Sequence, residues 1–108
     1  MENEEYNGAE RRAYFRVTYP PTERPILRIG KNEFDVMDIS ERGLRFWNNQ
    51  NIKLSEWVRG TIIFHNNSSL NVEGRIVWEY ENGIGVKLIT SIPYTRILEE
   101  QRYLINLG

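Results

Sequence analysis

The sequence predicts an all-β fold, a sandwich or barrel of mostly antiparallel strands, followed by one helix. Three observations lead to this prediction. Apolar and polar residues alternate in short runs, which is the pattern of half-buried strands. Turn-forming residues separate these runs at short intervals. A single stretch with helical spacing stands at the end of the chain.

The expected strands follow one another between clear turn signals. Pro20-Pro21 separates the first two runs, Ser40–Gly43 predicts a turn, and Asn82-Gly83 is the strongest hairpin signal in the chain. The strand-like runs are 14–19, 26–29, 34–39, 44–47, 58–64, 70–78 and 84–88. Because alternate residues of a strand share a face, Asp38 is grouped with Phe34 and Val36.

The last segment predicts one amphipathic helix over residues 93–106. Thr90 or Ser91 is a suitable cap, and Pro93 suits the first turn. The apolar stripe is expected to consist of Tyr94, Ile97, Leu98, Leu104 and Ile105, with Glu99, Glu100 and Arg102 on other faces. This stripe must cover the barrel or meet another chain, so a homodimer is possible.

Length and composition limit the classes of protein that this chain can be. With 108 residues and 12.9 kDa, we expect a flexible acidic tail over 1–10 and one domain over 11–108. The chain has no cysteine and one histidine, His65, which excludes disulfides, thiol chemistry and a multi-histidine metal site. No apolar run suits a membrane span and no secretory signal is evident, so we expect a cytoplasmic location without membrane insertion.

The charge is balanced in total and uneven along the chain. A net charge of −1 argues against a general DNA- or RNA-binding protein, which usually carries a basic excess. Residues 1–10 hold four acids and no base, whereas residues 11–31 hold six bases and one acid. A local arginine cluster on a neutral protein is typical of a site for a small, specific anion, although a solvated charged surface also explains it.

Two motifs carry the functional prediction. The first is Arg12-x-x-x-Arg16, with Arg11 directly before it, and the second is Asp38-Ile39-Ser40-Glu41-Arg42-Gly43. Each also has an ordinary explanation: two arginines four apart occur by chance, and Asp, Ser and Gly favour turns. Together, in this order, the two motifs resemble the PilZ domain family. Gly74–Trp78 and Gly83–Leu88 extend the resemblance to later strands of that family.

The resemblance implies a fold, a ligand and site residues. PilZ domains are six-stranded antiparallel β-barrels, usually with a C-terminal helix, and they bind cyclic di-GMP without a further cofactor. By resemblance, Arg12 and Arg16 take guanine and phosphate, while Asp38 and Ser40 take a guanine edge. Gly43 permits a tight turn beneath the ligand. The chemistry agrees, since arginine bonds guanine O6 and N7 or phosphate in pairs, and a carboxylate accepts from guanine N–H groups.

Arg11 and Trp78 are also expected to bind the ligand, but each has an alternative explanation. In the family, an additional arginine at the position of Arg11 accompanies two intercalated ligand molecules rather than one, although a surface charge explains it equally simply. By resemblance, the indole of Trp78 can stack on guanine. Trp78 is also predicted to lie on the same strand face as Val72 and Ile76, which equally suits a core tryptophan. The arginine arm is expected to close over the ligand and to signal to an unidentified protein partner.

Three rival functions stay open at this stage. A PilZ-like barrel can act only through protein contacts. A small barrel with three tryptophans and six tyrosines can bind single-stranded nucleic acid, although lysine is scarce. An enzyme is the third, but His65 lies in no nucleophile motif and no metal ligand set is evident. We therefore predict a receptor and no catalysis.

Overall fold

A closed barrel of antiparallel strands forms the body of the molecule. The computed structural model describes residues 15–107, which form seven strands, one short 3-10 helix and one α-helix. The barrel strands are β2 (Ile26–Ile29), β3 (Asn32–Ser40), β4 (Gly43–Trp47), β5 (Trp57–Ile63), β6 (Ser69–Tyr80) and β7 (Gly83–Leu88). They pair in the order β3-β2-β5-β6-β7-β4, and β4 pairs again with β3 to close the ring. The expected six-stranded antiparallel barrel is thus confirmed.

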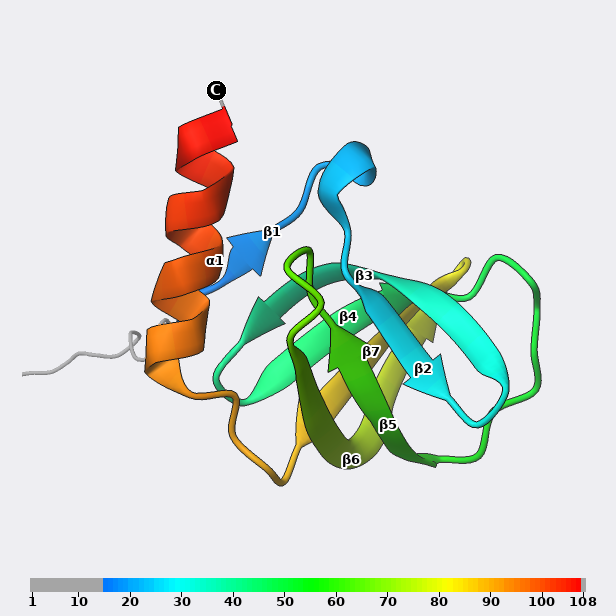
Figure 1. Ribbon diagram of the computed structural model, residues 1–108. Helices are drawn as coiled ribbons and strands as arrows, with labels where there is room; N and C mark the ends of the chain where they lie inside the picture. The colour runs from blue at the N-terminus through cyan, green and yellow to red at the C-terminus, as the bar shows by residue number, and fades with distance from the viewer. Residues whose placement is uncertain (1–14, 108) are drawn as a thin grey trace, which may run out of the picture.

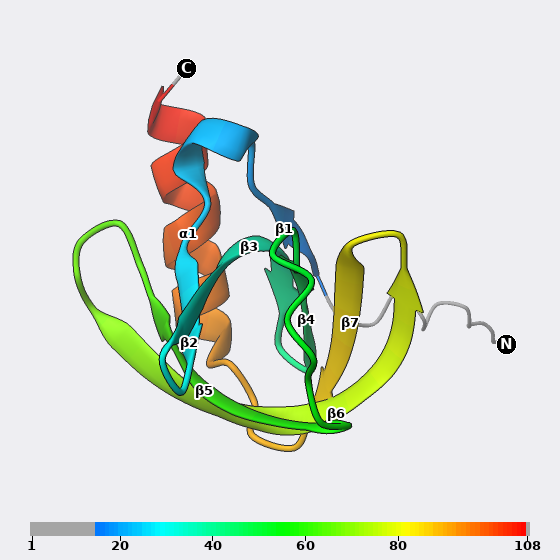
Figure 2. The same cartoon turned by 90° about the vertical axis from the view of Figure 1, so that its right-hand side faces the viewer.

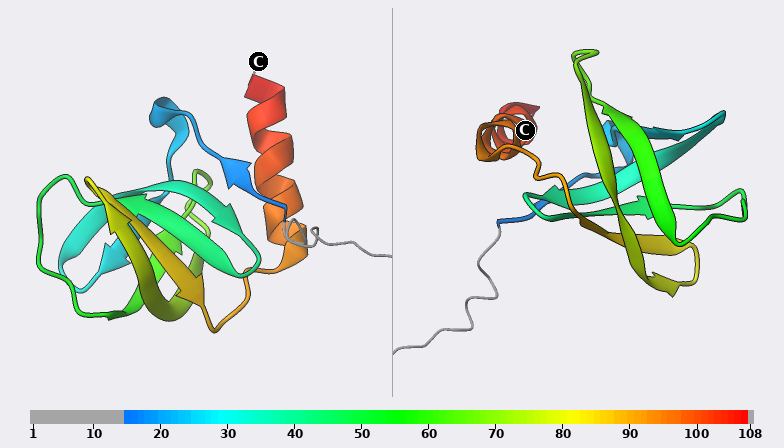
Figure 3. Two further views of the ribbon diagram at one scale, coloured as in Figure 1. Left: turned by 180° about the vertical axis from the view of Figure 1, so that it is seen from behind. Right: turned by 90° about the horizontal axis from the view of Figure 1, so that it is seen from below.

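A seventh strand and the C-terminal helix lie outside the ring. Strand β1 (Val17–Thr18) pairs with the end of β3, with Val17 opposite Ile39. The 3-10 helix η2 (Pro21–Glu23) then carries the chain to β2, which pairs with the beginning of β3. Helix α1 (Tyr94–Leu107) stands beside β1 at one end of the barrel (Figure 1). The views from the side and from below show the helix next to the ring and not inside it (Figures 2 and 3).

The interior of the barrel is apolar because every strand sends alternate residues inward. In β4, Leu44 and Phe46 are buried, whereas Arg45 and Trp47 face outward, as the sequence predicts. The rings of Phe34 and Phe46 meet with their centroids 5.2 Å apart. The fully closed ring leaves the six strands without free hydrogen-bonding edges along most of their length.

The β6–β7 hairpin differs from its prediction by one residue. The turn is formed by Glu81 and Asn82, and Gly83 is already the first residue of β7, opposite Tyr80. Glu81 takes the left-handed conformation with φ 55°. The carbonyl of Asn82 accepts a hydrogen bond from the backbone N–H of Asn48 at 2.7 Å. This tertiary bond favours a register that the local Asn-Gly pattern does not predict.

Two irregularities interrupt the ladders of β3 and β6 and change which side chains face outward. The register of β3 against β4 shifts between Val36 and Asp38, and that of β6 against β7 shifts between Ile76 and Trp78. Such bulges turn the following side chains to the other face of a strand. Asp38 therefore leaves the face of Phe34 and Val36, and Ile39 enters the core in its place. The predicted common face of Phe34, Val36 and Asp38 is wrong for this reason.

Helix α1 packs on the barrel through a narrower stripe than the sequence predicts. Ile97 is buried and Leu104 packs against the core, but Tyr94 and Ile105 are 50% and 63% exposed. Glu100, expected on a polar face, is fully buried. The buried Ile97 and Glu100 and the partly buried Leu104 form one row along the helix. The row is narrow because the helix packs beside β1 and nearby loops instead of on a broad sheet. Thr90 is not the cap, since its hydroxyl accepts from the N–H of Glu73.

The buried Glu100 lies beside groups from two other parts of the chain and from its own helix. The Tyr19 hydroxyl donates to Glu100 Oε1 at 2.7 Å. Glu100 Oε2 has no hydrogen-bond partner among the described residues, but His65 Nδ1 and Arg96 Nη1 lie 3.6 and 3.7 Å away. Burial raises the pKa of the Tyr19 phenol far above its ordinary value, and the bond to Glu100 raises it further, so Tyr19 stays a donor.

Aromatic contacts fix the same side of the helix. Tyr103 stacks on His65 with ring centroids 3.5 Å apart, and its hydroxyl donates to Glu23 Oε1 at 2.8 Å. The guanidinium of Arg96 lies 4.5 Å from the centre of the Phe64 ring.

Over residues 15–107, no helix is long and apolar enough to cross a membrane.

Replacing Tyr19 by Phe tests how the helix is held. Tyr19→Phe leaves Glu100 Oε1 buried without its donor, so we expect a loss of about 1–3 kcal/mol in the free energy of unfolding. Urea denaturation followed by circular dichroism measures it. Tyr103→Phe is the matched control. The hydroxyl that it removes donates a hydrogen bond to Glu23, which is partly buried, whereas Glu100 is fully buried. Equal losses in the two variants would contradict this account of the helix contact.

Candidate ligand-binding site

The Asp38 carboxylate lies between two arginines on the outer face of the barrel. Arg16 Nη1 donates to Asp38 Oδ1 at 2.5 Å. Arg45 Nε donates to Oδ2 at 2.7 Å, and Arg45 Nη2 forms an ion pair with the same oxygen at 2.6 Å. Asp38 is 1% exposed, whereas the side chains of Arg16 and Arg45 are 52% and 36% exposed. The arginines therefore cover the carboxylate and keep their own outer sides open to solvent.

Three adjacent segments bring these side chains together. Arg16 directly precedes β1, Asp38 lies in β3, and Arg45 lies in β4 directly opposite Asp38 in the register. The bulge at Met37 turns Asp38 outward, and the Met37 carbonyl accepts from the N–H of Tyr19 at 2.9 Å, which continues the β1 pairing. A buried carboxylate is stable only when it is paired, and here two cations pair with it.

Ser40 and Gly43 close the hairpin beside Asp38. They are the last residue of β3 and the first of β4, and they pair across the ladder. The Ser40 hydroxyl lies 3.5 Å from the Gly43 carbonyl, at the limit of a hydrogen bond, and it faces the same pocket. A Cβ atom at Gly43 would lie 3.2 Å from the Val86 carbonyl, so the glycine permits close packing of β4 on β7.

Trp78 lies flat across strand β7 and is 45% exposed. The bulge between Ile76 and Trp78 turns the indole to the outer face, so the alternative of a core tryptophan is wrong. The ring covers Gly85, where a Cβ atom would collide with Cε2 and Nε1 of Trp78. An exposed aromatic ring held against backbone is suited to stacking with a planar base.

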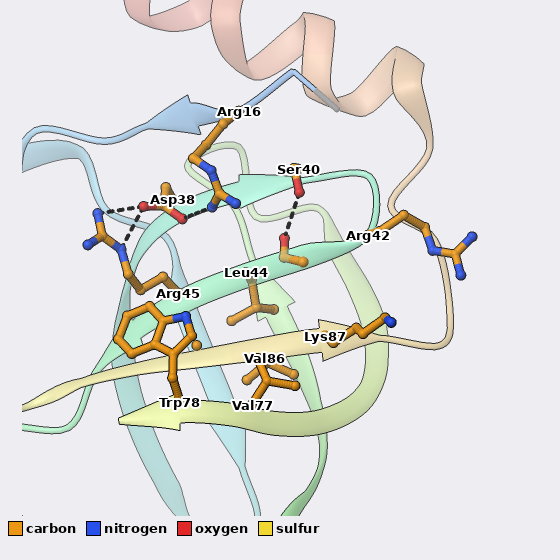
Figure 4. Close-up of a pocket in the computed structure, with 12 residues that line it drawn as sticks. Arg16, Asp38, Ser40, Arg42, Leu44, Arg45, Val77, Trp78, Val86 and Lys87 are labelled. Atoms are coloured by element: carbon orange, nitrogen blue, oxygen red, sulfur yellow. Dashed lines mark hydrogen bonds and ion pairs between the residues drawn. The ribbon is translucent and has the colours of Figure 1, made fainter. Parts of the chain in front are cut away.

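These residues line one open pocket with a volume of about 670 Å³ (Figure 4). This size falls within the range of ligand sites, roughly 300–1,000 Å³. Arg45, Asp38 and Trp78 lie toward one end, and Arg42 and Lys87 lie toward the other (Figure 4). Its described lining comprises Arg16, Asp38, Ser40, Arg42, Gly43, Leu44, Arg45, Val77, Trp78, Gly85, Val86 and Lys87. Four cations against one carboxylate make the pocket attractive to an anion.

The structure brings together five of the seven site residues predicted from the sequence: Arg16, Asp38, Ser40, Gly43 and Trp78. The other two, Arg11 and Arg12, lie outside the described residues.

Sequence reasoning missed Arg42, Arg45 and Lys87. A signal for two of them existed, because alternation along β4 and β7 turns Arg45 and Lys87 outward, and Gly43 pairs with Lys87. Arg45 pairs with Asp38 and Lys87 pairs with Gly43, so both lie on the face that carries the second motif.

Among the described residues, the other charged side chains lie outside this pocket. Glu73, across the barrel in β6, accepts hydrogen bonds from Trp57 Nε1 and from Arg59, and these bonds lower its pKa, with Trp57 contributing most. Within residues 15–107, no three histidine or acidic side chains come together as a metal site would require. The pocket at Asp38 is therefore the site that the motifs and the geometry share.

The fold and the pocket together define a small antiparallel β-barrel that presents a cationic binding pocket on its outer face. A family model described as the PilZ domain matches residues 10–105. The chain belongs to the PilZ domain family. A search of curated proteins finds no significant match.

Two solved structures share the fold. An uncharacterized protein from Legionella has a TM-score of 0.65 and 14% identity, covering 86% of this chain and 96% of that chain. YcgR from Escherichia coli, crystallised in complex with c-di-GMP, has a TM-score of 0.57 and 19% identity, covering 90% of this chain. The match covers 46% of the YcgR chain, so this chain spans less than half of that protein. At these identities the likeness shows the fold alone.

Adding one methyl group at Gly85 tests how Trp78 is held. In Gly85→Ala the added Cβ atom would collide with Cε2 and Nε1 of Trp78. Trp78 must therefore rotate away from β7. We expect the indole N–H resonance of Trp78, assigned through its loss in Trp78→Leu, to move clearly while the other tryptophan signals stay in place. The signal of Trp57, whose indole N–H donates to Glu73, serves as the internal reference. An unmoved Trp78 signal would show that the ring does not rest on Gly85.

Proposed function

We propose that the protein is a receptor for cyclic di-GMP and that the pocket at Asp38 is its binding site. The observation that carries the proposal is the Asp38 carboxylate beside Arg16, Arg45 and an exposed Trp78 in one pocket of ligand size. Membership of the PilZ family and the likeness to YcgR, which was crystallised with c-di-GMP, support it. The proposed role is binding, with no catalytic step.

The chemistry of the ligand matches the pocket group by group. Cyclic di-GMP has two phosphates, which favour the cations Arg16, Arg42 and Lys87. Guanine presents N1–H and N2–H donors on one edge, for which Asp38 is the suited acceptor and Ser40 a possible second partner. The exposed face of Trp78 suits stacking on a purine. We assign Gly43 the role of bringing backbone close to the ligand without a side chain.

The N-terminal arginines complete the proposed site. Arg12 is the first residue of the Arg12-x-x-x-Arg16 motif, and Arg11 precedes it. We assign both to the ligand, with Arg11 favouring two intercalated molecules in the site. Because Arg16 already contacts Asp38, a bound ligand at this place lies within reach of residues just before it. Closure of this arm is the proposed signal to a protein partner.

Calorimetric titration with cyclic di-GMP tests the binding proposal. We expect the protein to bind, and Arg12→Ala, Arg16→Ala and Asp38→Ala each to bind about tenfold more weakly or worse, because each loses a hydrogen bond to a charged group. Arg59→Ala is the matched control: this arginine is 77% exposed, pairs with Glu73 and lines a different pocket. The same titration gives the number of ligand molecules per chain.

Two results of this titration would overturn the proposal. One is the absence of binding heat and of any thermal shift for the unaltered protein. The other is equal binding by the protein, the three motif variants and Arg59→Ala, which would place the ligand away from Asp38. In the first case a role through protein contacts alone becomes the better explanation for the barrel.

Hydrogen exchange tests the proposed closure of the arm. On saturation with cyclic di-GMP, we expect slower exchange over residues 5–18, because backbone amides near the bound arginines lose access to water. Exchange in β5, which pairs with β2 and β6 and not with β1 or β3, serves as the internal reference. Unchanged exchange over residues 5–18 at saturation would contradict the closure and leave the binding proposal intact.

A further inference from the structure

Both oxygens of the Asp38 carboxylate are occupied by side chains of the protein itself. Arg16 Nη1 donates to Oδ1, and Arg45 contacts Oδ2 through a hydrogen bond from Nε and an ion pair from Nη2. We propose that Arg45 is an internal competitor of the ligand, occupying on Asp38 the place that the guanine edge takes in the complex. This inference rests on the proposed function and concerns the regulation of the same site.

The burial of Asp38 requires that something moves when a ligand binds there. Asp38 is 1% exposed, so a base cannot reach its oxygens while both arginines stay in place. The two arginines are the covering groups, and both have exposed outer sides along which they can swing into solvent. Binding of guanine at Asp38 is thus an exchange of one partner for another, and not the filling of a free acceptor.

The fork of Arg45 has the same donor pattern as the guanine edge. Arginine Nε–H and Nη2–H are two donors on one planar carbon; here Nε donates to Asp38 Oδ2 at 2.7 Å and Nη2 forms an ion pair with it at 2.6 Å. Guanine N1–H and N2–H are likewise two parallel donors on one planar carbon. One carboxylate oxygen cannot accept hydrogen bonds from both the Arg45 guanidinium and the guanine edge. The two groups therefore exclude each other at Oδ2.

The geometry distinguishes Arg45 from Arg16 in this role. Arg45 contacts the carboxylate through two nitrogens, one by a hydrogen bond and one by an ion pair, while Arg16 makes a single contact through Nη1. Arg45 is also anchored in β4 opposite Asp38, so its fork returns to the carboxylate whenever the ligand leaves. Arg16 belongs to the motif whose second arginine is assigned to the ligand itself. The displaced group is therefore Arg45, and Arg16 stays with Asp38 and the ligand.

This exchange has two consequences for the receptor. The empty site keeps its buried carboxylate paired, which protects the fold from the cost of an unpaired charge. The affinity for the ligand is lower than the contacts in the complex alone would give, because the Arg45 fork must first be released. Arg45 thereby sets the concentration of ligand at which the receptor responds.

The test uses variants that separate the fork of Arg45 from its charge. Arg45→Lys keeps the positive charge near an anionic ligand but offers a single point donor in place of the fork. We expect Arg45→Lys to bind cyclic di-GMP about five- to tenfold more tightly than the unaltered protein, as expected for loss of one competing hydrogen bond. Arg59→Lys, at an exposed arginine in another pocket, is the matched control and should not change the affinity.

A direct readout accompanies the affinities. The Nε–H resonance of Arg45, assigned through its loss in Arg45→Lys, is expected to shift and to exchange faster with water at saturation with cyclic di-GMP. Equal or weaker binding by Arg45→Lys, or an unchanged Arg45 resonance at saturation, would overturn the inference while the proposed function stands. Absence of binding by the unaltered protein would instead overturn the proposed function, so the two failures are distinguishable.

Discussion

The pairing of the buried Asp38 carboxylate with Arg16 and Arg45 is the interaction on which the pocket depends. A carboxylate that is 1% exposed must keep its cations, because an unpaired charge in such a place is strongly destabilising. This requirement ties together β3, β4 and the residue before β1. It also decides how a ligand can enter, since any new partner of Asp38 replaces one that is already bound.

The pocket and the C-terminal helix meet at the same short strand. Arg16 lies one residue before β1 and contacts Asp38, while Tyr19 lies one residue after it and donates to Glu100 of α1. The β3–β4 turn adds a second connection, because the carbonyl of Glu41 accepts from the N–H of Ile92, just before the helix, at 2.8 Å. A change in the pairing of Asp38 therefore acts on elements that also hold the helix. If the proposed function holds, these contacts give binding at the pocket a physical connection to the helix.

Local sequence patterns predicted the barrel well and the site in part. Alternation in β4 and β7 was sufficient to predict their core-facing residues, and the two motifs were sufficient for Arg16, Asp38, Ser40 and Gly43. The bulges at Met37 and Val77 were not predictable, because a one-residue register shift depends on the neighbouring strand. They decide that Asp38 and Trp78 face the pocket. Glu100 was misplaced for a similar reason, because its burial depends on tertiary contacts such as the hydrogen bond from Tyr19, 81 residues away.

A crystal structure of the protein with cyclic di-GMP tests the central claim most directly. The account predicts a guanine whose N1–H and N2–H donate to Asp38, with the Arg45 guanidinium swung away from Oδ2 and Arg16 still at the carboxylate. Trp78 would lie against a base with Gly85 beneath it. A complex in which Arg45 keeps both bonds to Asp38 and the ligand binds elsewhere on the barrel would contradict the account.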